Sequence, residues 1–213
     1  MNSPGSPGAM GTNWESTLWH EFCHTVTLGA TLNRIPRWLT EGISVYEERL
    51  RDPSCGTKMT PAFRRRMLEA DGLIPIADLS AALTAFNDPD TINFAYYEAS
   101  ILVEYILEAY GDAALRKVLG DLRRSGIAEK SLARRLAPLD ELESGFTKFA
   151  VDLARKVAPQ ADWEIPAEDS PLHRDPAGVA AYLEKYPDNI WALSAHCGSL
   201  LAERKWQEVV APA

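Results

Sequence analysis

The chain has 213 residues, of which 46% are hydrophobic and 24% charged, and its formal net charge is −8. This composition is typical of a folded protein with one ordinary core and a small appended part, and it disfavours disordered and fibrous classes. The negative charge, with basic residues scattered along the chain, argues against a nucleic-acid partner. No apolar run reaches the roughly 18 to 20 residues of a membrane-spanning helix, and we expect no signal peptide either. Three cysteines are too few for a disulfide framework and leave the compartment undecided.

Helical patterns follow one another along most of the chain. Residues 1–12 are small, polar and rich in Pro and Gly, and are expected to form a flexible leader. No segment shows the alternation of a β-strand, so the predicted fold class is mainly α. Apolar spacing and helix start and stop signals predict helices at 13–28, 36–51, 61–71, a short segment after 78, 91–110, 113–125, 129–136 and 139–157.

The C-terminal part differs in composition. Residues 159–176 are rich in proline and acidic residues, and we interpret them as a linker that follows a main domain at 13–158. Beyond the linker, helices are predicted at 175–186 and 189–202, with the start of a third near residue 206. In residues 177–213 these paired helices resemble at most one and a half tetratricopeptide units. Such a surface would offer a binding site to a protein partner.

Residues 20–24 read HEFCH, an HExxH sequence inside the first predicted helix. Side chains four residues apart in an α-helix point only about 40° from one another, so His20 and His24 can bind one metal ion. Glu21 lies about 80° to one side, where it can contact a metal-bound water as a general base. HExxH also arises by chance in surface helices, so a second signal is needed.

The same helix carries an apolar stripe on the side opposite the two histidines. Leu18, Phe22 and Val26 recur every four residues, and we expect them to be buried in a core. Cys23 is interpreted as a packed thiol and not as a metal ligand.

The next predicted helix supplies a third candidate ligand. Zinc in a hydrolytic site takes three protein ligands and keeps a fourth position for water. Glu41 comes 17 positions after His24, in a helix that a short loop can fold back against the first, and it would complete a His2Glu set. The alternative is an exposed helix acid. Glu47 and Glu48 are interpreted in that way, although Glu48 shares the face of Glu41.

HEFCH followed by WLTEGISVYEE resembles the gluzincin metallopeptidases, in which a Glu in an Asn/Thr-Glu-Gly setting follows HExxH. The short spacing and the RIPRW sequence before the Glu are more similar to the peptidase MA-like domains of bacterial tetratricopeptide-repeat proteins than to the aminopeptidase N type. The resemblance covers roughly residues 13–157 and implies one zinc ion and a peptide or protein substrate. It also implies a tyrosine that donates to the oxyanion, at Tyr96 by ungapped counting and at Tyr97 as the second choice. Core packing is the alternative for both tyrosines.

Two functions follow from these observations. The first is zinc-dependent peptide-bond hydrolysis, in which Glu21 takes a proton from the attacking water and passes it to the leaving amine. The second is a tetratricopeptide-type helical scaffold, catalytically weak or inactive, with a vestigial metal site. Gluzincins usually carry a β-rich subdomain before the HExxH helix, whereas only 19 residues precede His20 here. The chain is therefore expected to be a fragment or a weak catalyst.

Overall fold

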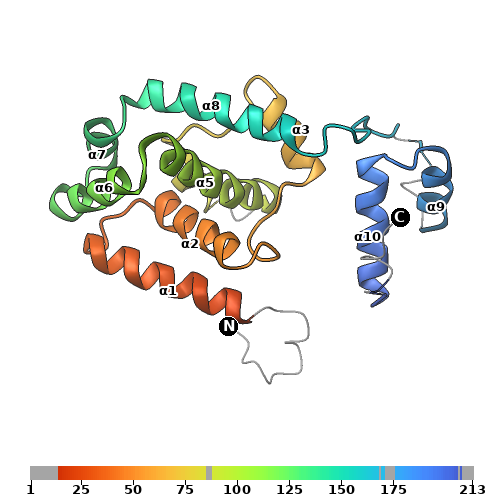
Figure 1. Cartoon of the computed structure of the whole chain (residues 1–213), viewed down its shortest axis with the longest axis horizontal. Coiled ribbons are helices and arrows are strands. Elements are labelled where there is room, and N and C mark those ends of the chain that lie inside the picture. The colour runs from red at the N-terminus through yellow and green to blue at the C-terminus, as the bar shows by residue number, and fades with distance from the viewer. Residues whose placement is uncertain (1–13, 85–87, 168, 171–175, 206, 208–213) are drawn as a thin grey trace. The chain divides into compact units, whose positions relative to one another are not determined.

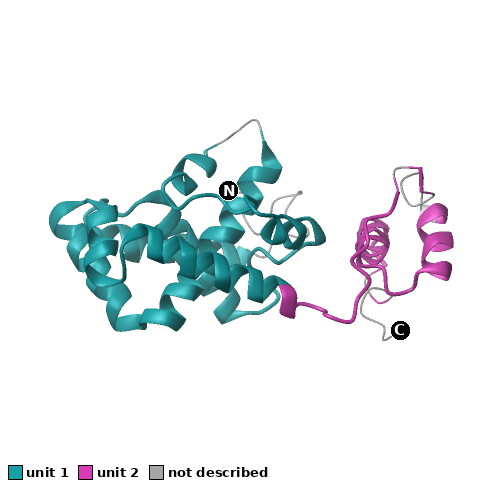
Figure 2. Cartoon of the chain, turned by 90° about the horizontal axis from the view of Figure 1, so that it is seen from above, with its two compact units in different colours: residues 1–154 teal, residues 155–213 magenta. Residues whose placement is uncertain are grey.

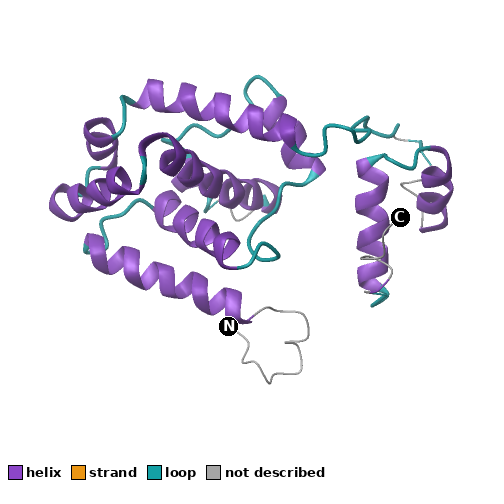
Figure 3. Cartoon of the chain, in the orientation of Figure 1, coloured by secondary structure: helices purple, strands orange, loops and turns teal. Residues whose placement is uncertain are grey.

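The computed structural model describes residues 14–84, 88–167, 169–170, 176–205 and 207 (Figure 1). The chain forms two compact units, Met1–Ala154 and Arg155–Ala213, coloured separately in Figure 2. Within the described residues the regular structure consists of helices, without a strand, which confirms the predicted mainly α fold (Figure 3). None of the helices in these ranges combines the length and apolar character needed to cross a membrane. The leader expected at 1–12 lies outside the described residues.

The helix bounds agree closely with the prediction. The helices that begin in the first unit are α1 (Trp14–Thr31), α2 (Arg37–Arg51), α3 (Pro61–Leu68), α4 (Leu79–Ala82), α5 (Pro89–Tyr110), α6 (Asp112–Ser125), α7 (Ala128–Arg135) and α8 (Leu139–Lys156). Local chemistry explains where several of them begin and end. Thr60 accepts a hydrogen bond from the Phe63 N–H at the start of α3, and Asp88 accepts one from Thr91 at the start of α5. Gly126, with φ of +67°, ends α6 in the left-handed conformation that glycine adopts without strain.

Helix α5 is the centre of the first unit. Its residues are buried on almost every side, and its buried members lie at 94–95, 97–103 and 106. Helix α2 packs against one side of α5, and α1 packs against the far side of α2 (Figure 1). Helix α8 covers another side of α5, where the Tyr105 ring lies 6.1 Å from the ring of Phe146 and 5.6 Å from that of Phe149. The order α1–α2–α5 places the HExxH helix at the outside of the unit.

Helix α1 buries the opposite face from the one we predicted. Leu18, Phe22 and Val26 are 61%, 53% and 53% exposed, so the expected burial of this apolar stripe is wrong. The residues of α1 that pack inward are Cys23 and two threonines, Thr27 and Thr31. The physical reason is that α2 packs against the histidine-bearing side of α1. Periodicity identified the two faces of the helix correctly but assigned the core to the wrong one.

Hydrogen bonds from two arginines join the C-terminal end of α1 to the C-terminal end of α6. The Arg123 guanidinium, on α6, donates to the carbonyls of Gly29 and Ala30 in the last turn of α1. In return, Arg34, just after α1, donates to the carbonyls of Arg123 and Arg124. The last carbonyls of a helix have no partner within the helix, and cations near them are favoured by the helix dipole. This reciprocal capping fixes the direction of α1.

The second unit contains α9 (Pro176–Lys185) and α10 (Ile190–Ala202). Asn189 caps α10 by accepting a hydrogen bond from the Ala192 N–H, and its side-chain amide donates to Asp162 Oδ2 and to the Glu164 carbonyl, each at 2.9 Å. Part of the predicted linker is therefore attached to the start of α10. The predicted helix near residue 206 lies mostly outside the described residues.

Candidate metal centre

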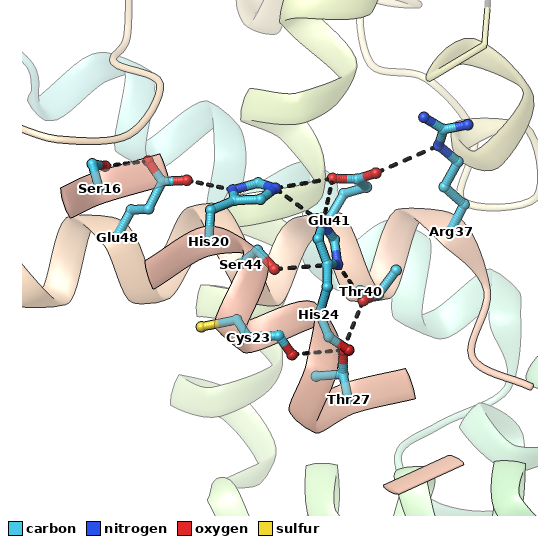
Figure 4. A network of polar contacts seen from close by, with 10 residues as sticks. All are labelled: Ser16, His20, Cys23, His24, Thr27, Arg37, Thr40, Glu41, Ser44 and Glu48. Atoms are coloured by element: carbon cyan, nitrogen blue, oxygen red, sulfur yellow. Dashed lines mark hydrogen bonds and ion pairs between the residues drawn. The ribbon is translucent and has the colours of Figure 1, made fainter. Parts of the chain in front are cut away.

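Three side chains from α1 and α2 converge at one point, as the sequence predicted. His20 and His24 lie one turn apart on α1, and Glu41 lies on the adjacent turn of α2. The Nε2 atoms of His20 and His24 are 3.0 Å apart. Glu41 Oε2 lies 3.3 Å from His20 Nε2 and 3.2 Å from His24 Nε2. Figure 4 shows the Glu41 carboxylate beside the two imidazoles. Within the described residues this is the set of His, Cys, Asp and Glu side chains close enough to hold a metal ion.

The donor set fits zinc. Zinc bonds of about 2.0–2.1 Å arranged as a tetrahedron place neighbouring ligand atoms roughly 3.3–3.4 Å apart. The three separations, 3.0, 3.2 and 3.3 Å, are close to that requirement without any movement of the helices. Two imidazole nitrogens and a carboxylate oxygen are also the ligand types of catalytic zinc sites.

A network of hydroxyl groups holds the ring of His24. Its Nδ1 lies 2.8 Å from Thr40 Oγ1, and Thr40 Oγ1 in turn lies 2.7 Å from Thr27 Oγ1. Ser44 Oγ lies 3.4 Å from the same nitrogen. Because Nδ1 is engaged by these groups, Nε2 is the nitrogen directed toward Glu41. Thr27 on α1 and Thr40 on α2 thus hold the His24 ring in place, a role that their residue type alone did not indicate.

A carboxylate holds the ring of His20. Glu48 Oε1 is hydrogen-bonded to His20 Nδ1, and Glu48 Oε2 accepts a hydrogen bond from Ser16 Oγ at 2.9 Å. The interpretation of Glu48 as an exposed helix acid is therefore wrong, because its side chain is only 13% exposed. The seven-residue separation from Glu41 was the available signal, since seven residues are about two helical turns and return to the same face.

The electrostatics of the centre favour a positive charge. Burial alone would lower the pKa of His20, but the carboxylates of Glu41 and Glu48 outweigh it and raise this pKa to about 9. Burial would likewise raise the pKa of Glu41, yet the two histidines and Arg37 hold it below its usual value. Arg37 Nε lies 3.5 Å from the Glu41 oxygen that faces away from the histidines. A cation held between the three donor atoms would be stabilised by both carboxylates.

Most of the first unit matches a known protein family. Residues 9–140 match the model of the peptidase MA superfamily, which is more than half of the chain. The chain belongs to this superfamily. No curated protein matches it, and no solved structure does so either. The matched region contains α1, α2 and α5, so the three converging side chains lie inside the peptidase MA domain.

The other predicted site residues of the peptidase MA domain lie on α1 and α5. Glu21 is exposed on α1, next to His20, and its carboxylate is engaged in none of the hydrogen bonds or ion pairs found among the described residues. Tyr97 is buried and stacks on Phe63 with ring centroids 5.4 Å apart, and burial raises its pKa. Tyr96 is half-buried at the edge of the same core. Of the two tyrosines, Tyr97 is therefore part of the core packing, and Tyr96 stays a prediction.

A hollow of about 390 Å³ opens beside His20. Its walls come from the first turns of α1, from Glu48 and from the loop after α2, where Ser54 and Gly56 lie. Gly56 has φ of +70°, so the loop makes a turn there that glycine permits. The hollow lies on the Glu48 side of His20, and neither His24 nor Glu41 is among its lining residues.

Proposed function

We propose that this chain carries the zinc site of a peptidase that hydrolyses peptide bonds. The observation that carries the proposal is the convergence of His20 Nε2, His24 Nε2 and Glu41 Oε2 within 3.0–3.3 Å in a peptidase MA domain. Three protein ligands of these types leave the fourth tetrahedral position for water or substrate. Zinc bound there would supply an acidified water molecule and polarisation of the scissile carbonyl.

Glu21 has the position of a general base in this proposal. It adjoins a metal ligand but points about 80° away from the mean direction of the two histidines, so it does not complete the ligand set itself. Its exposed carboxylate is open to an incoming water molecule. Glu21 would accept a proton from the attacking water and return it to the leaving amine. Tyr96 is proposed as a hydrogen-bond donor to the oxyanion formed at the attacked carbonyl.

A non-enzymatic scaffold is the alternative function, and it involves the second unit. A hollow of about 480 Å³ there is lined by Tyr182 and Tyr186, whose rings lie 4.7 Å apart, together with acidic Asp162 and Glu164. Aromatic side chains at such a site suit a peptide or protein ligand. In this alternative the tetratricopeptide-like helices bind the partner, and the metal centre has no hydrolytic role.

One experiment distinguishes the two functions. The zinc-loaded chain is incubated with an unbiased peptide library, and new termini are identified by mass spectrometry. The proposal expects cleavage that a chelator abolishes and that added zinc restores, and a Glu41→Gln variant should lose both zinc and cleavage. Stoichiometric zinc binding without cleavage would support the scaffold with a vestigial site. Cleavage that continues after metal removal would contradict the peptidase proposal.

A further inference from the structure

We propose that α6 and α7 form a binding site for a phosphate group, with Arg124, Lys130 and Arg134 as the binding residues. The two helices follow one another along the chain at one end of the first unit (Figure 1). Residues from both of them line a hollow of about 100 Å³. None of the candidate metal ligands lines this hollow, so the proposal is independent of the proposed peptidase function.

Positive charge is concentrated in this part of a negatively charged protein. Residues 112–136 contain seven Lys and Arg against three Asp and Glu, whereas the whole chain has a formal net charge of −8. A local excess of one sign raises the concentration of oppositely charged ligands at that surface. The helices α6 and α7 therefore attract anions, although the protein as a whole repels them.

Three guanidinium groups surround one buried carboxylate at the hollow. Arg135 donates two hydrogen bonds to Asp121, from Nε to Oδ2 at 2.8 Å and from Nη2 to Oδ1 at 3.0 Å. Arg124 Nη2 is hydrogen-bonded to the same Oδ1. Arg134 Nη1 lies 3.9 Å from Oδ2, which is an ion pair but too long for a hydrogen bond. A single negative charge thus leaves an excess of two positive charges among these arginines.

Lys130 adds a further cation to the walls of the hollow. It lies four residues before Arg134, so both side chains are on the same face of α7, one turn apart. Lys130 is exposed and belongs to none of the ion pairs found among the described residues. The side chains of Arg124 and Arg134 are 66% and 69% exposed, so an incoming anion can reach both of them. The lining therefore offers three cations that Asp121 alone does not neutralise.

The size and charge of the hollow indicate the class of ligand. Pockets for drug-sized ligands measure about 300–1,000 Å³, so a hollow of this volume suits a small anion. Guanidinium groups bind phosphate oxygens through paired N–H donors, and a lysine ammonium adds a point charge. A phosphate monoester carries about −1.5 to −2 charges at pH 7, which matches the excess positive charge better than a monovalent anion does. Inorganic phosphate and the headgroup of phosphatidic acid share this chemistry.

Titration of the full chain with sodium phosphate provides the first test. ¹H–¹⁵N spectra are recorded at pH 7.5 while sodium chloride keeps the ionic strength constant, so that general screening does not change. The signals of α6 and α7 should shift and saturate. Lys130→Gln and Arg134→Gln should each weaken phosphate binding about tenfold, because each removes a charge-assisted contact. Shifts that do not saturate in the wild type would overturn the proposal.

Arg116→Gln is the matched control. It removes the same charge from α6, but Arg116 is paired with Asp112 and does not line the hollow. This variant should change phosphate affinity by less than about twofold, since an exposed charge outside the hollow is largely screened. A loss in Arg116→Gln as large as that in Lys130→Gln would mean that phosphate responds only to net charge, and it would overturn the site.

A vesicle experiment distinguishes the two sources of the phosphate group. The chain is sedimented with vesicles of phosphatidylcholine alone and with vesicles that also contain phosphatidic acid. Retention only by phosphatidic acid, lost in Lys130→Gln and kept in Arg116→Gln, supports the site with a lipid headgroup as its ligand. Saturable binding of inorganic phosphate without retention on vesicles supports the site with free phosphate as its ligand. Retention that is equal in both variants would contradict a role of the hollow in lipid binding.

Circular dichroism shows whether each variant folds. Both test positions are exposed, and in each variant Asp121 keeps its hydrogen bonds with Arg124 and Arg135. If Arg134→Gln nevertheless does not fold, Lys130→Gln decides the test, because no ion pair among the described residues is lost with it. Weaker phosphate binding by a folded Lys130→Gln supports the proposal, and wild-type affinity overturns it.

Discussion

Gly42 on α2 lies against the backbone of Ala99 on α5. A Cβ atom built on Gly42 would come within 2.5 Å of the Ala99 carbonyl oxygen and 2.8 Å of its carbon. Glycine in a helix interior normally costs about 1 kcal/mol relative to alanine, so its presence here needs a reason. The reason is the close approach of the two helices. Because Glu41 directly precedes Gly42, the same contact determines how close the backbone of this candidate metal ligand lies to α5.

Gly42→Ala should therefore destabilise the protein. The neighbouring atoms belong to the α5 backbone and cannot move aside cheaply, so we expect the free energy of unfolding to fall by about 1–3 kcal/mol. Gly120→Ala in α6 is the control, because the nearest atom to its new Cβ is the end of the Arg124 side chain at 4.0 Å. This control should gain up to about 1 kcal/mol from helix propensity. Urea unfolding of both variants decides the matter, and a neutral or stabilising Gly42→Ala would contradict the packing argument.

Glu21→Gln should abolish peptide cleavage while zinc binding stays close to that of the wild type. Glu21 is exposed and does not belong to the converging donor set, so its neutralisation removes a proton acceptor but no ligand. Zinc content by atomic absorption and cleavage by mass spectrometry are measured on the same sample. Full activity in this variant would rule out Glu21 as the general base, and loss of the metal would assign it a structural role instead.

The parts of this fold and site that depend on local geometry could be predicted from the sequence. The separation of His20 and His24 fixes their convergence because both lie on one helix, whatever surrounds it. Glu41 was also within reach of prediction, since a short loop constrains α2 to fold back beside α1. The hydrogen bond that Glu48 accepts from His20 was not, because it depends on how α2 is rotated against α1. The sequence indicates that Glu48 shares a face with Glu41, but not that this face is covered.

The apolar stripe of α1 shows equally that a sequence pattern does not reveal which face of a helix is covered. Hydrophobic periodicity states which residues share a face, while the choice of the buried face is made by the helices that pack against it. In α1 the buried face contains Thr27 and Cys23, whose small side chains allow α2 to come close. Leu18 and Phe22 remain exposed. Residue polarity therefore predicts the wrong face of this helix to be the buried one.

Phe22→Gln should change stability little if α1 lies as described. Phe22 is 53% exposed and contacts Trp19 with ring centroids 5.7 Å apart, so we expect a loss below about 1 kcal/mol. Phe94→Ala is the contrasting variant, because Phe94 is 1% exposed in the core and its truncation should cost about 3–5 kcal/mol. Both values come from denaturant unfolding at pH 7. A loss at Phe22 as large as that at Phe94 would mean that the stripe is buried after all.

Glu98 should make the protein less stable as the pH rises. Its carboxyl group is fully buried on α5, where it accepts from the Ile74 N–H at 2.9 Å. Burial raises its pKa from 4.5 to about 8, against the opposing effects of that hydrogen bond and of Arg66. The folded state therefore binds this proton more tightly than the unfolded state does. The stabilisation it provides is complete below pH 4.5 and is lost as the pH rises through 8, at up to about 1.4 kcal/mol per pH unit.

Glu98→Gln tests this dependence directly. The amide oxygen can still accept from Ile74, but the side chain no longer has to lose a proton in a buried site. We expect the variant to gain stability relative to the wild type steadily between pH 5 and pH 8, with the largest advantage at pH 9. Glu108→Gln, an exposed position on the same helix, should run parallel to the wild type. Urea unfolding at each pH gives the comparison. Parallel curves for Glu98→Gln and the wild type would mean that this carboxyl group is ionised throughout, with a pKa close to its ordinary value.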